Sequence, residues 1–118
     1  LAVAKYDSGT ILWVHEANDP HNTGKERPVI VIRHNGRPYS SVECTVMCLG
    51  HGSQAEAHRT PQLQPDDHYT GISFSKDTYL LPWSIHTIPP AALNEMHGMG
   101  ELTKAGRKLV AREFARML

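Results

Sequence analysis

The sequence has little cysteine, no long apolar run and no excess of charge of either sign. Its 118 residues include two cysteines, 12 Lys+Arg and 12 Asp+Glu, and its isoelectric point is about 7.3. Because the charges balance, a nucleic-acid partner would have to bind a local basic patch rather than the whole surface. No apolar stretch approaches the roughly 20 residues of a membrane span, and no signal-peptide pattern opens the chain. We therefore expect a globular protein that is not held in a membrane.

The two cysteines, Cys44 and Cys48, fall in one segment with strand character. At roughly 3.3 Å per residue their Cα atoms would lie about 13 Å apart, whereas a disulfide needs about 7 Å or less. Cys-x-x-x-Cys is not a usual zinc motif, and the eight histidines include no His-x-x-x-His pair. We therefore expect reduced core thiols, no bound metal or other cofactor, and a reducing, cytoplasmic location.

The order of elements is strands first and helices last. Five segments have the β-branched and aromatic residues typical of strands: 10–16, 28–34, 42–49, 71–74 and 78–83. In the second of these both residue parities are apolar, so it is expected to be buried on both faces. Loops are expected over residues 17–26 and 50–68, the latter with a short strand near Gln62–Gln64, and "NGRP" (35–38) predicts a turn because it opens with Asn-Gly.

Two helices are expected after the strands. Pro89 and Pro90 suit the first turn of a short helix that Gly98 would end. Thr103 is expected to cap a last helix, whose apolar stripe is Val110, Phe114, Met117 and Leu118. The basic face of this helix is expected to be either solvated or in contact with RNA. The order predicts one domain over residues 1–118, mainly β with C-terminal helices, in which a small barrel has a helical cover.

The densest charge in the chain stands directly before its most apolar strand. Lys25, Glu26 and Arg27 precede Pro28 and four β-branched residues. A strand buried on both faces is rigid, so a residue at its start is held in place. The guanidinium of Arg27 is permanently charged and can fork onto two phosphate oxygens, and Lys25 is suited to steering phosphates. The alternative for Arg27 is an ion pair with Glu16 or Glu26.

Four segments together resemble a known family. They are "GTILWV" (9–14), "GKERPVIVI" (24–32), "YLL" (79–81) and "IHTI" (85–88). The chain resembles the MazF/PemK family of toxin endoribonucleases from Lys5 to Leu118, and Gly-x-x-Arg-Pro is the most specific part of the match. The resemblance implies an SH3-like barrel of the MazF/PemK/CcdB type, a homodimer, and metal-independent cleavage of single-stranded RNA. It also implies an antitoxin protein whose tail lies across the RNA groove.

The resemblance makes Arg27 catalytic, but two other family positions differ here. The Ser or Thr that usually ends the third strand falls at Gly50, and the usual Asp-Gln is replaced by "PWS" (82–84). A catalytically weakened relative that only binds RNA or an antitoxin is therefore the alternative function. A topoisomerase poison on the same fold is disfavoured, because the ending "FARML" (114–118) does not resemble the tail by which those relatives contact the enzyme.

Cleavage of RNA by this route needs a base for the 2′-OH proton, a fixed cation at the phosphate, and an acid for the leaving 5′-oxygen. Glu26 is a candidate base, with a solvated loop carboxylate as its alternative. His51 is a second acid–base candidate, because an unperturbed histidine titrates near pH 6.5. It stands between Gly50 and Gly52, where the backbone can approach a phosphate closely. Its alternative is an ordinary loop histidine.

Four further residues are candidates for RNA contact: His21, Ser53, Trp83 and His86. Trp83 follows a proline at a strand end, where it can stack on a base or pack in a dimer interface. Trp13 lies within an apolar strand and is expected to be a core residue.

Overall fold

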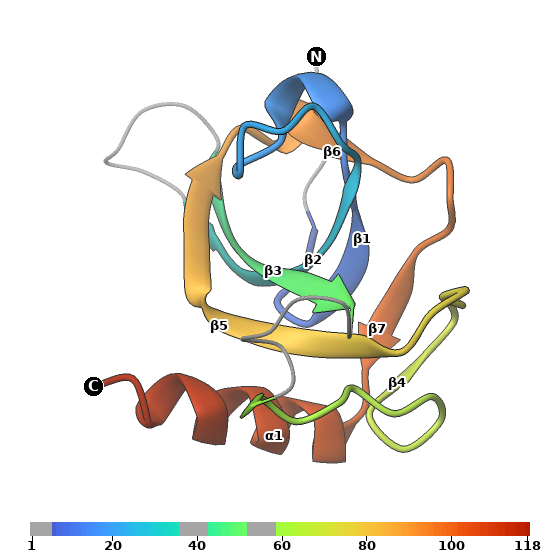
Figure 1. Cartoon of the computed structure of the whole chain (residues 1–118), viewed down its shortest axis with the longest axis vertical. Coiled ribbons are helices and arrows are strands. Elements are labelled where there is room, and N and C mark those ends of the chain that lie inside the picture. The colour runs from blue at the N-terminus through green and yellow to red at the C-terminus, as the bar shows by residue number, and fades with distance from the viewer. Residues whose placement is uncertain (1–5, 36–42, 52–58) are drawn as a thin grey trace.

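The computed structural model describes residues 6–35, 43–51 and 59–118 (Figure 1). They form one antiparallel sheet of seven strands, with the path β4-β7-β1-β2-β3-β5 and β6 paired to β1. The strands are β1 (Thr10–Val14), β2 (Arg27–Asn35), β3 (Glu43–His51), β4 (Tyr69–Thr70), β5 (Thr78–Ile88), β6 (Leu93–Asn94) and β7 (Gly100–Leu102). One α-helix, α1 (Lys104–Ala115), follows the last strand, and short 3-10 turns cover Glu16–Asn18 and Pro90–Ala92.

Strand β2 lies between β1 and β3 and is buried on both faces, as its sequence predicts. Val29 and Val31 point into one hydrophobic cluster, and Ile30 points into a second cluster on the opposite face. All three side chains are fully buried. Because both faces pack at the density of a protein interior, the start of β2 is a rigid base for the residue that opens it.

Strand β5 is sharply bent (Figure 1). Its pairing with β3 shifts register between Met47 and Leu49, so that residues 81–84, which include Pro82, lie opposite the single residue Cys48. Proline has no N–H to give to a sheet ladder, so it is tolerated where the ladder is interrupted. The strand predicted to end at Trp83 therefore continues to Ile88. Ser84, within the segment where the register shifts, is buried and contacts Cys48 of β3.

Two predicted elements after the loop are wrong. Residues 71–74 form no strand, because Ile72 and Phe74 pack against the second hydrophobic cluster without pairing to another strand. The short strand in this region is β4, which ends just before them at Thr70. The helix predicted from Pro89 to Gly98 is only the 3-10 turn Pro90–Ala92, because Leu93 and Asn94 pair with β1. Gly98 has a φ of +100° and lies in a turn, not at a helix end. The described chain thus has one C-terminal α-helix rather than two.

Helix α1 begins as predicted, but a different stripe is buried. The Thr103 hydroxyl accepts a hydrogen bond from the Gly106 N–H at 3.1 Å. The buried positions are Gly106, Leu109, Val110 and Glu113, on the side that faces β5 and β7. Phe114, Met117 and Leu118 are 38%, 52% and 95% exposed. The predicted stripe is therefore correct at Val110 and wrong beyond it.

The mainly β architecture is confirmed, but the sheet is not seen to close. Within residues 6–35, 43–51 and 59–118, the two end strands of the path, β4 and β5, are not paired with each other. The short strand expected near Gln62–Gln64 is a single bridge between Gln62 and Tyr79. The turn expected at 35–38 lies mostly outside the described residues. No helix in the described part of the chain is long and apolar enough to cross a bilayer.

Candidate active site

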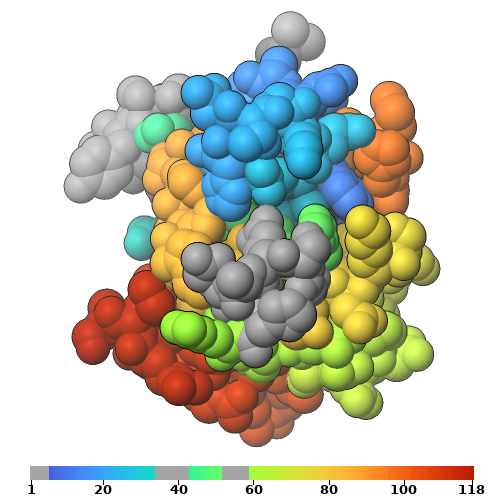
Figure 2. All heavy atoms as spheres, viewed as in Figure 1, coloured from blue at the N-terminus to red at the C-terminus, as the bar shows by residue number. Residues whose placement is uncertain are grey.

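A cleft of about 630 Å³ opens at the mouth of β2. Figure 2 shows the green end of β3 between the blue loop that precedes β2 and the yellow segment that precedes β5. The described residues that line the cleft come from these three parts of the chain and from β1 and the turn after β6: Trp13, Lys25, Glu26, Arg27, Pro28, Leu49, Gly50, His51, Ser73, Phe74, Ser75, Lys76, Thr78 and His97. The structure therefore gathers Arg27, Glu26, Lys25 and His51, four of the predicted site residues, in one place.

Arg27 is the first residue of β2, and its side chain is held from the preceding loop. Its Nε donates to Oδ1 of Asp19 at 2.5 Å, and its Nη2 donates to the Thr23 hydroxyl at 2.8 Å. The partner of the ion pair is thus Asp19, not Glu16 or Glu26. A guanidinium has five N–H donors, so these two hydrogen bonds leave it able to bind an anion in the cleft. The Arg27 side chain is only 13% exposed, which restricts its orientation.

Asp19 organises the loop between β1 and β2. Its carboxylate accepts hydrogen bonds from the backbone N–H groups of His21, Thr23 and Lys25, and from the Thr23 hydroxyl. Burial by itself would raise the pKa of Asp19, but the hydrogen bonds from Thr23, His21, Lys25 and Arg27 outweigh burial and lower the pKa far below its usual value. The carboxylate therefore stays charged beside Arg27 at neutral pH.

Glu26 is paired across the cleft. Its carboxylate accepts from Asn94 Nδ2 at 3.0 Å and contacts His97 Nε2 at 3.0 Å and 3.1 Å. Asn94 and His97 come from β6 and the turn that follows it, so Glu26 is not a solvated loop carboxylate. The His97 ring also meets Trp13 edge-on, with 5.5 Å between the ring centroids. Trp13 is therefore only partly core, because it also lines the cleft.

His51 ends strand β3 instead of lying in a loop. It pairs with Thr78 of β5, and the neighbouring Gly50 is buried and pairs with Tyr79. Strand pairing thus fixes the backbone of His51, which lines the cleft. The position expected to carry a hydroxyl, Gly50, has none, but Thr78 lies on the adjacent strand and lines the same cleft. The Thr78 hydroxyl donates to the Lys76 carbonyl at 3.1 Å.

Sequence reasoning missed several cleft residues. Lys76, Thr78 and His97 are far from Arg27 in the sequence, and Asp19 lies in a loop of ordinary composition. The segment "SFSKDT" (73–78) is rich in hydroxyl groups and holds a lysine, which is a weak signal for a phosphate-binding loop. No local signal pointed to Asp19 or His97, because the contacts of Asp19 depend on the conformation of its loop and the contact of His97 with Glu26 depends on how distant strands pair.

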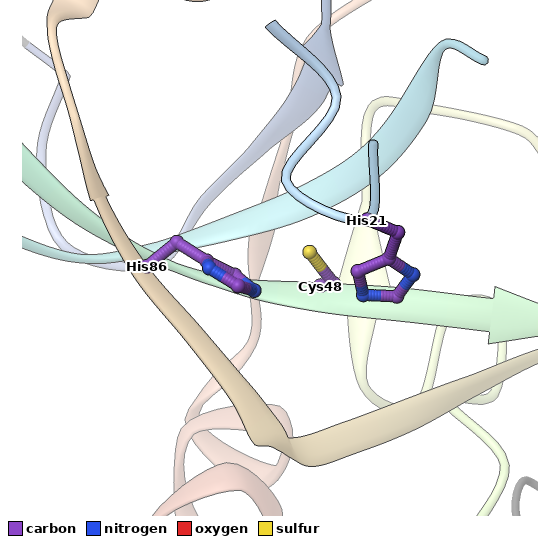
Figure 3. Close-up of side chains that lie close together, drawn as sticks. All are labelled: His21, Cys48 and His86. Atoms are coloured by element: carbon purple, nitrogen blue, oxygen red, sulfur yellow. The ribbon is translucent and has the colours of Figure 1, made fainter. Parts of the chain in front are cut away.

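Three of the remaining predicted RNA contacts, His21, His86 and Trp83, do not line this cleft. His21 and His86 lie in a second cluster with Cys48 (Figure 3), and both imidazoles contact the Ser84 hydroxyl. Trp83 is 45% exposed and does not line the cleft. Ser53 lies outside the described residues.

The second cluster is a polar group against the core. The Ser84 hydroxyl is 2.7 Å from His21 Nε2 and 2.9 Å from His86 Nε2. Burial lowers the pKa of His21, as does the nearby charge of Arg27, so its imidazole is neutral at pH 7. Burial raises the pKa of the Cys48 thiol. Asp19 links this cluster to the cleft, because it binds both the His21 backbone and the Arg27 side chain.

No family model matches the sequence, and no curated protein matches it either. What the protein does therefore has to be argued from the geometry of the cleft.

Proposed function

We propose that the chain is a toxin endoribonuclease of the MazF/PemK type, which cleaves single-stranded RNA without a metal ion and is neutralised by an antitoxin protein. One observation carries the proposal. Arg27, the first residue of the rigid strand β2, is held in place by its ion pair with Asp19, and it lines a cleft that also contains the acid–base groups of Glu26, His51 and His97. An SH3-like barrel is the fold that goes with this function, and the strongly bent β5 and the meander β1-β2-β3 support it.

The substrate class follows from the cleft's charge. Lys25, Arg27 and Lys76 line it against the single carboxylate Glu26, which gives the described walls a net positive charge suited to a phosphate backbone. Trp13 and Phe74 add aromatic surface on which an unpaired base can stack. Bases are free to stack in this way only in a single strand.

The proposed reaction is a transfer of the phosphoryl group within the RNA. The 2′-oxygen attacks the adjacent phosphorus, the bond to the 5′-oxygen breaks, and a cyclic phosphate and a 5′-hydroxyl result. Arg27 binds the phosphate oxygens, where negative charge grows in the transition state. Two groups are placed to move protons: His51, and the carboxylate–imidazole pair Glu26–His97.

A binding protein without activity is the second candidate function. Two observations favour it: Gly50 carries no hydroxyl at the end of β3, and the Glu26 carboxylate is already bound by Asn94 and His97. Such a protein would hold RNA or an antitoxin in the same cleft through Arg27 and the lysines.

We also propose a homodimer, as the resemblance implies. Phe114, Met117 and Trp83 are exposed apolar side chains that a second subunit can cover. Light scattering at micromolar concentration is expected to show about twice the chain mass of 13.1 kDa. A monomer under those conditions would contradict the dimer.

The test is cleavage of a long single-stranded RNA in EDTA, with the new ends mapped. The wild type is compared with Arg27→Ala, and with Arg33→Ala as a matched control, since Arg33 is an exposed arginine of the same strand. Loss of one electrostatic donor costs roughly 10²–10³-fold in rate. We expect Arg27→Ala to lose activity on this scale and Arg33→Ala to keep it.

A third variant separates folding from chemistry. Arg27→Ala leaves the buried Asp19 without its cation, so its far-UV circular dichroism and melting temperature are measured with the rates. Arg27→Lys keeps the positive charge but loses the two-pronged hydrogen bonding of the guanidinium. This variant is expected to stay folded and to cleave slowly. Full activity in both Arg27 variants would overturn the assigned role. RNA binding without cleavage by the wild type would favour the second candidate function.

A further inference from the structure

The fold brings together three potential metal ligands that are scattered in the sequence. His21 comes from the loop before β2, Cys48 from β3 and His86 from β5, and one donor atom of each lies within 4.8 Å of the others. Figure 3 shows the Cys48 sulfur between the two imidazole rings. We propose that His21, Cys48 and His86 form a binding site for a zinc-class divalent ion. The site lies beyond the proposed ribonuclease chemistry, because none of the three residues lines the cleft.

The donor set selects the class of metal. Two imidazoles and one thiolate suit Zn²⁺ and its substitute Co²⁺, whereas Mg²⁺ and Ca²⁺ prefer oxygen ligands. Carboxylate oxygens are not part of the cluster, since the Asp19 carboxylate is committed to Arg27 and to the loop backbone. Three protein ligands leave one position of a tetrahedron for a further ligand, and the Ser84 hydroxyl lies among the three donors, 2.7 Å from His21 Nε2 and 2.9 Å from His86 Nε2.

The site can close with small side-chain movements. Zn–N bonds of about 2.0–2.1 Å and a Zn–S bond of about 2.3 Å place tetrahedral ligands roughly 3.3–3.8 Å apart. Separations of up to 4.8 Å therefore have to shorten by up to about 1.5 Å. His21 lies on a loop and His86 follows the register shift of β5, and both side chains are half-buried, so they can rotate toward the fully buried Cys48. The Ser84 hydroxyl would turn aside or supply the fourth ligand.

An ion here would fasten the loop that positions Arg27. His21 lies two residues after Asp19, whose carboxylate binds the Arg27 side chain and the His21 backbone. Bonds from His21 to β3 and β5 through the ion would tie this loop to the sheet. The expected role is structural: bound metal stabilises the folded protein and takes no part in the RNA chemistry.

The experiment measures metal binding directly, on the untagged chain. The protein is stripped with a chelator, dialysed against Zn²⁺ or Co²⁺, and assayed for bound metal by mass spectrometry of the elements. We expect about one ion per chain, a rise in melting temperature with Zn²⁺, and a thiolate-to-cobalt absorption band in the near ultraviolet. Cys48→Ser should abolish this band. His21→Gln and His86→Gln should weaken binding more than about tenfold, since even indirect contacts to a site are worth 10–100-fold.

Two matched controls use residues of the same types outside the cluster. Cys44→Ser changes the other buried thiol, and His15→Gln changes an exposed histidine of the same region; both should bind metal as the wild type does. His21→Gln lies on a surface loop and is expected to fold even if Cys48→Ser does not. Bound metal well below one ion per chain, or equal binding in wild type and in His21→Gln and His86→Gln, would overturn the site. Cleavage by the stripped protein is followed in parallel, so that loss of the metal site and loss of the ribonuclease activity are told apart.

Discussion

The Nε atom of Arg27 lies 2.5 Å from Oδ1 of Asp19, and the Asp19 side chain is 1% exposed. Both carboxylate oxygens are used, because Oδ2 accepts from Thr23 and from the Lys25 backbone N–H. A buried charge with this many donors is stable only while its cation stays in place. The loop before β2 and the guanidinium at its mouth therefore behave as one unit, which fixes where an anion can bind.

Replacing Asp19 by Asn is expected to destabilise the protein at neutral pH by roughly 3 kcal/mol, the scale for breaking a buried charge pair. The folded-state pKa of Asp19 lies below its unfolded value, so the unfolded chain binds the extra proton first as the pH falls. The stabilisation from Asp19 is thus present above about pH 4 and is lost progressively below it. The urea midpoints of the two proteins should differ at pH 7 and converge toward pH 2.

These urea titrations are run with a chelator, so that metal bound at the proposed His21–Cys48–His86 site does not affect the comparison. Asp77→Asn is the control, because Asp77 is exposed; its midpoint should follow the wild type at every pH. A gap between wild type and Asp19→Asn that stays constant from pH 7 to pH 2 would contradict the assigned ionisation.

Gly106→Ala is expected to destabilise the protein, although alanine is the better helix former by about 1 kcal/mol. A Cβ at this position would lie 2.0 Å from the His68 carbonyl oxygen. That oxygen already accepts from the Thr103 N–H at 2.9 Å, so it cannot move without loosening the start of α1. Overpacking costs about 1–3 kcal/mol, and the melting temperature should fall by several degrees.

Ala111→Gly, at an exposed site of the same helix, provides the comparison. It should lose only the propensity difference of about 1 kcal/mol. A melting temperature that rises in Gly106→Ala would show that α1 does not pack as closely on His68 as the structure indicates.

Sequence patterns predict the part of the fold that depends on local composition. The run of β-branched residues at 29–32 gives β2, its burial on both faces and the position of Arg27 at its mouth. The Thr103 cap follows from one residue type at one place. These features need only the period of apolar residues and the chemistry of a side chain.

What the sequence does not show depends on the conformation of a loop and on pairing between distant strands. The partner of Arg27 is Asp19 and not a neighbouring glutamate, because the loop before β2 brings the Asp19 carboxylate to the Arg27 side chain. Cys48 and His86 come together through the pairing of β3 with β5, whose register shifts at Cys48, and His21 joins them from the loop before β2. The spacing of His and Cys along the chain therefore gave no sign of the cluster.

Salt dependence should identify the lysines that hold RNA. Lys25→Gln and Lys76→Gln each remove one cation from the cleft. For a single strand each phosphate contact contributes about 0.7 to the slope of log K against log salt. We expect each variant to reduce the slope by about that amount, measured by fluorescence anisotropy with a 2′-O-methyl RNA, which lacks the attacking hydroxyl.

Lys108→Gln is the matched control, from the exposed face of α1. Its slope should equal that of the wild type if that face is merely solvated. A reduced slope in Lys108→Gln with unchanged slopes in the cleft variants would place the RNA on the helix instead of in the cleft.

The dependence of the cleavage rate on pH should distinguish the two acid–base candidates in the cleft. A histidine in either role must take up and release a proton during the reaction, so the curve of rate against pH should bend. Arg27 cannot cause such a bend, because it stays charged throughout. His51 reaches the cleft from the end of β3, whereas Glu26 and His97 reach it from the loop before β2 and the turn after β6. We expect His51→Ala to lower the rate and remove the bend, and His51→Gln to keep RNA binding.

His97→Gln is the matched control for His51→Ala. It changes the other imidazole in the same cleft and leaves Glu26 hydrogen-bonded to Asn94. Rates of the wild type, His51→Ala and His97→Gln are measured from pH 5 to 9 on one short RNA. If His51 moves the proton, His97→Gln keeps the bend and His51→Ala loses it. If the two results are reversed, the Glu26–His97 pair is the proton-transfer group. Curves of the same shape and height in all three proteins would remove both histidines from the chemistry and leave the carboxylate of Glu26 as the remaining base in the described cleft.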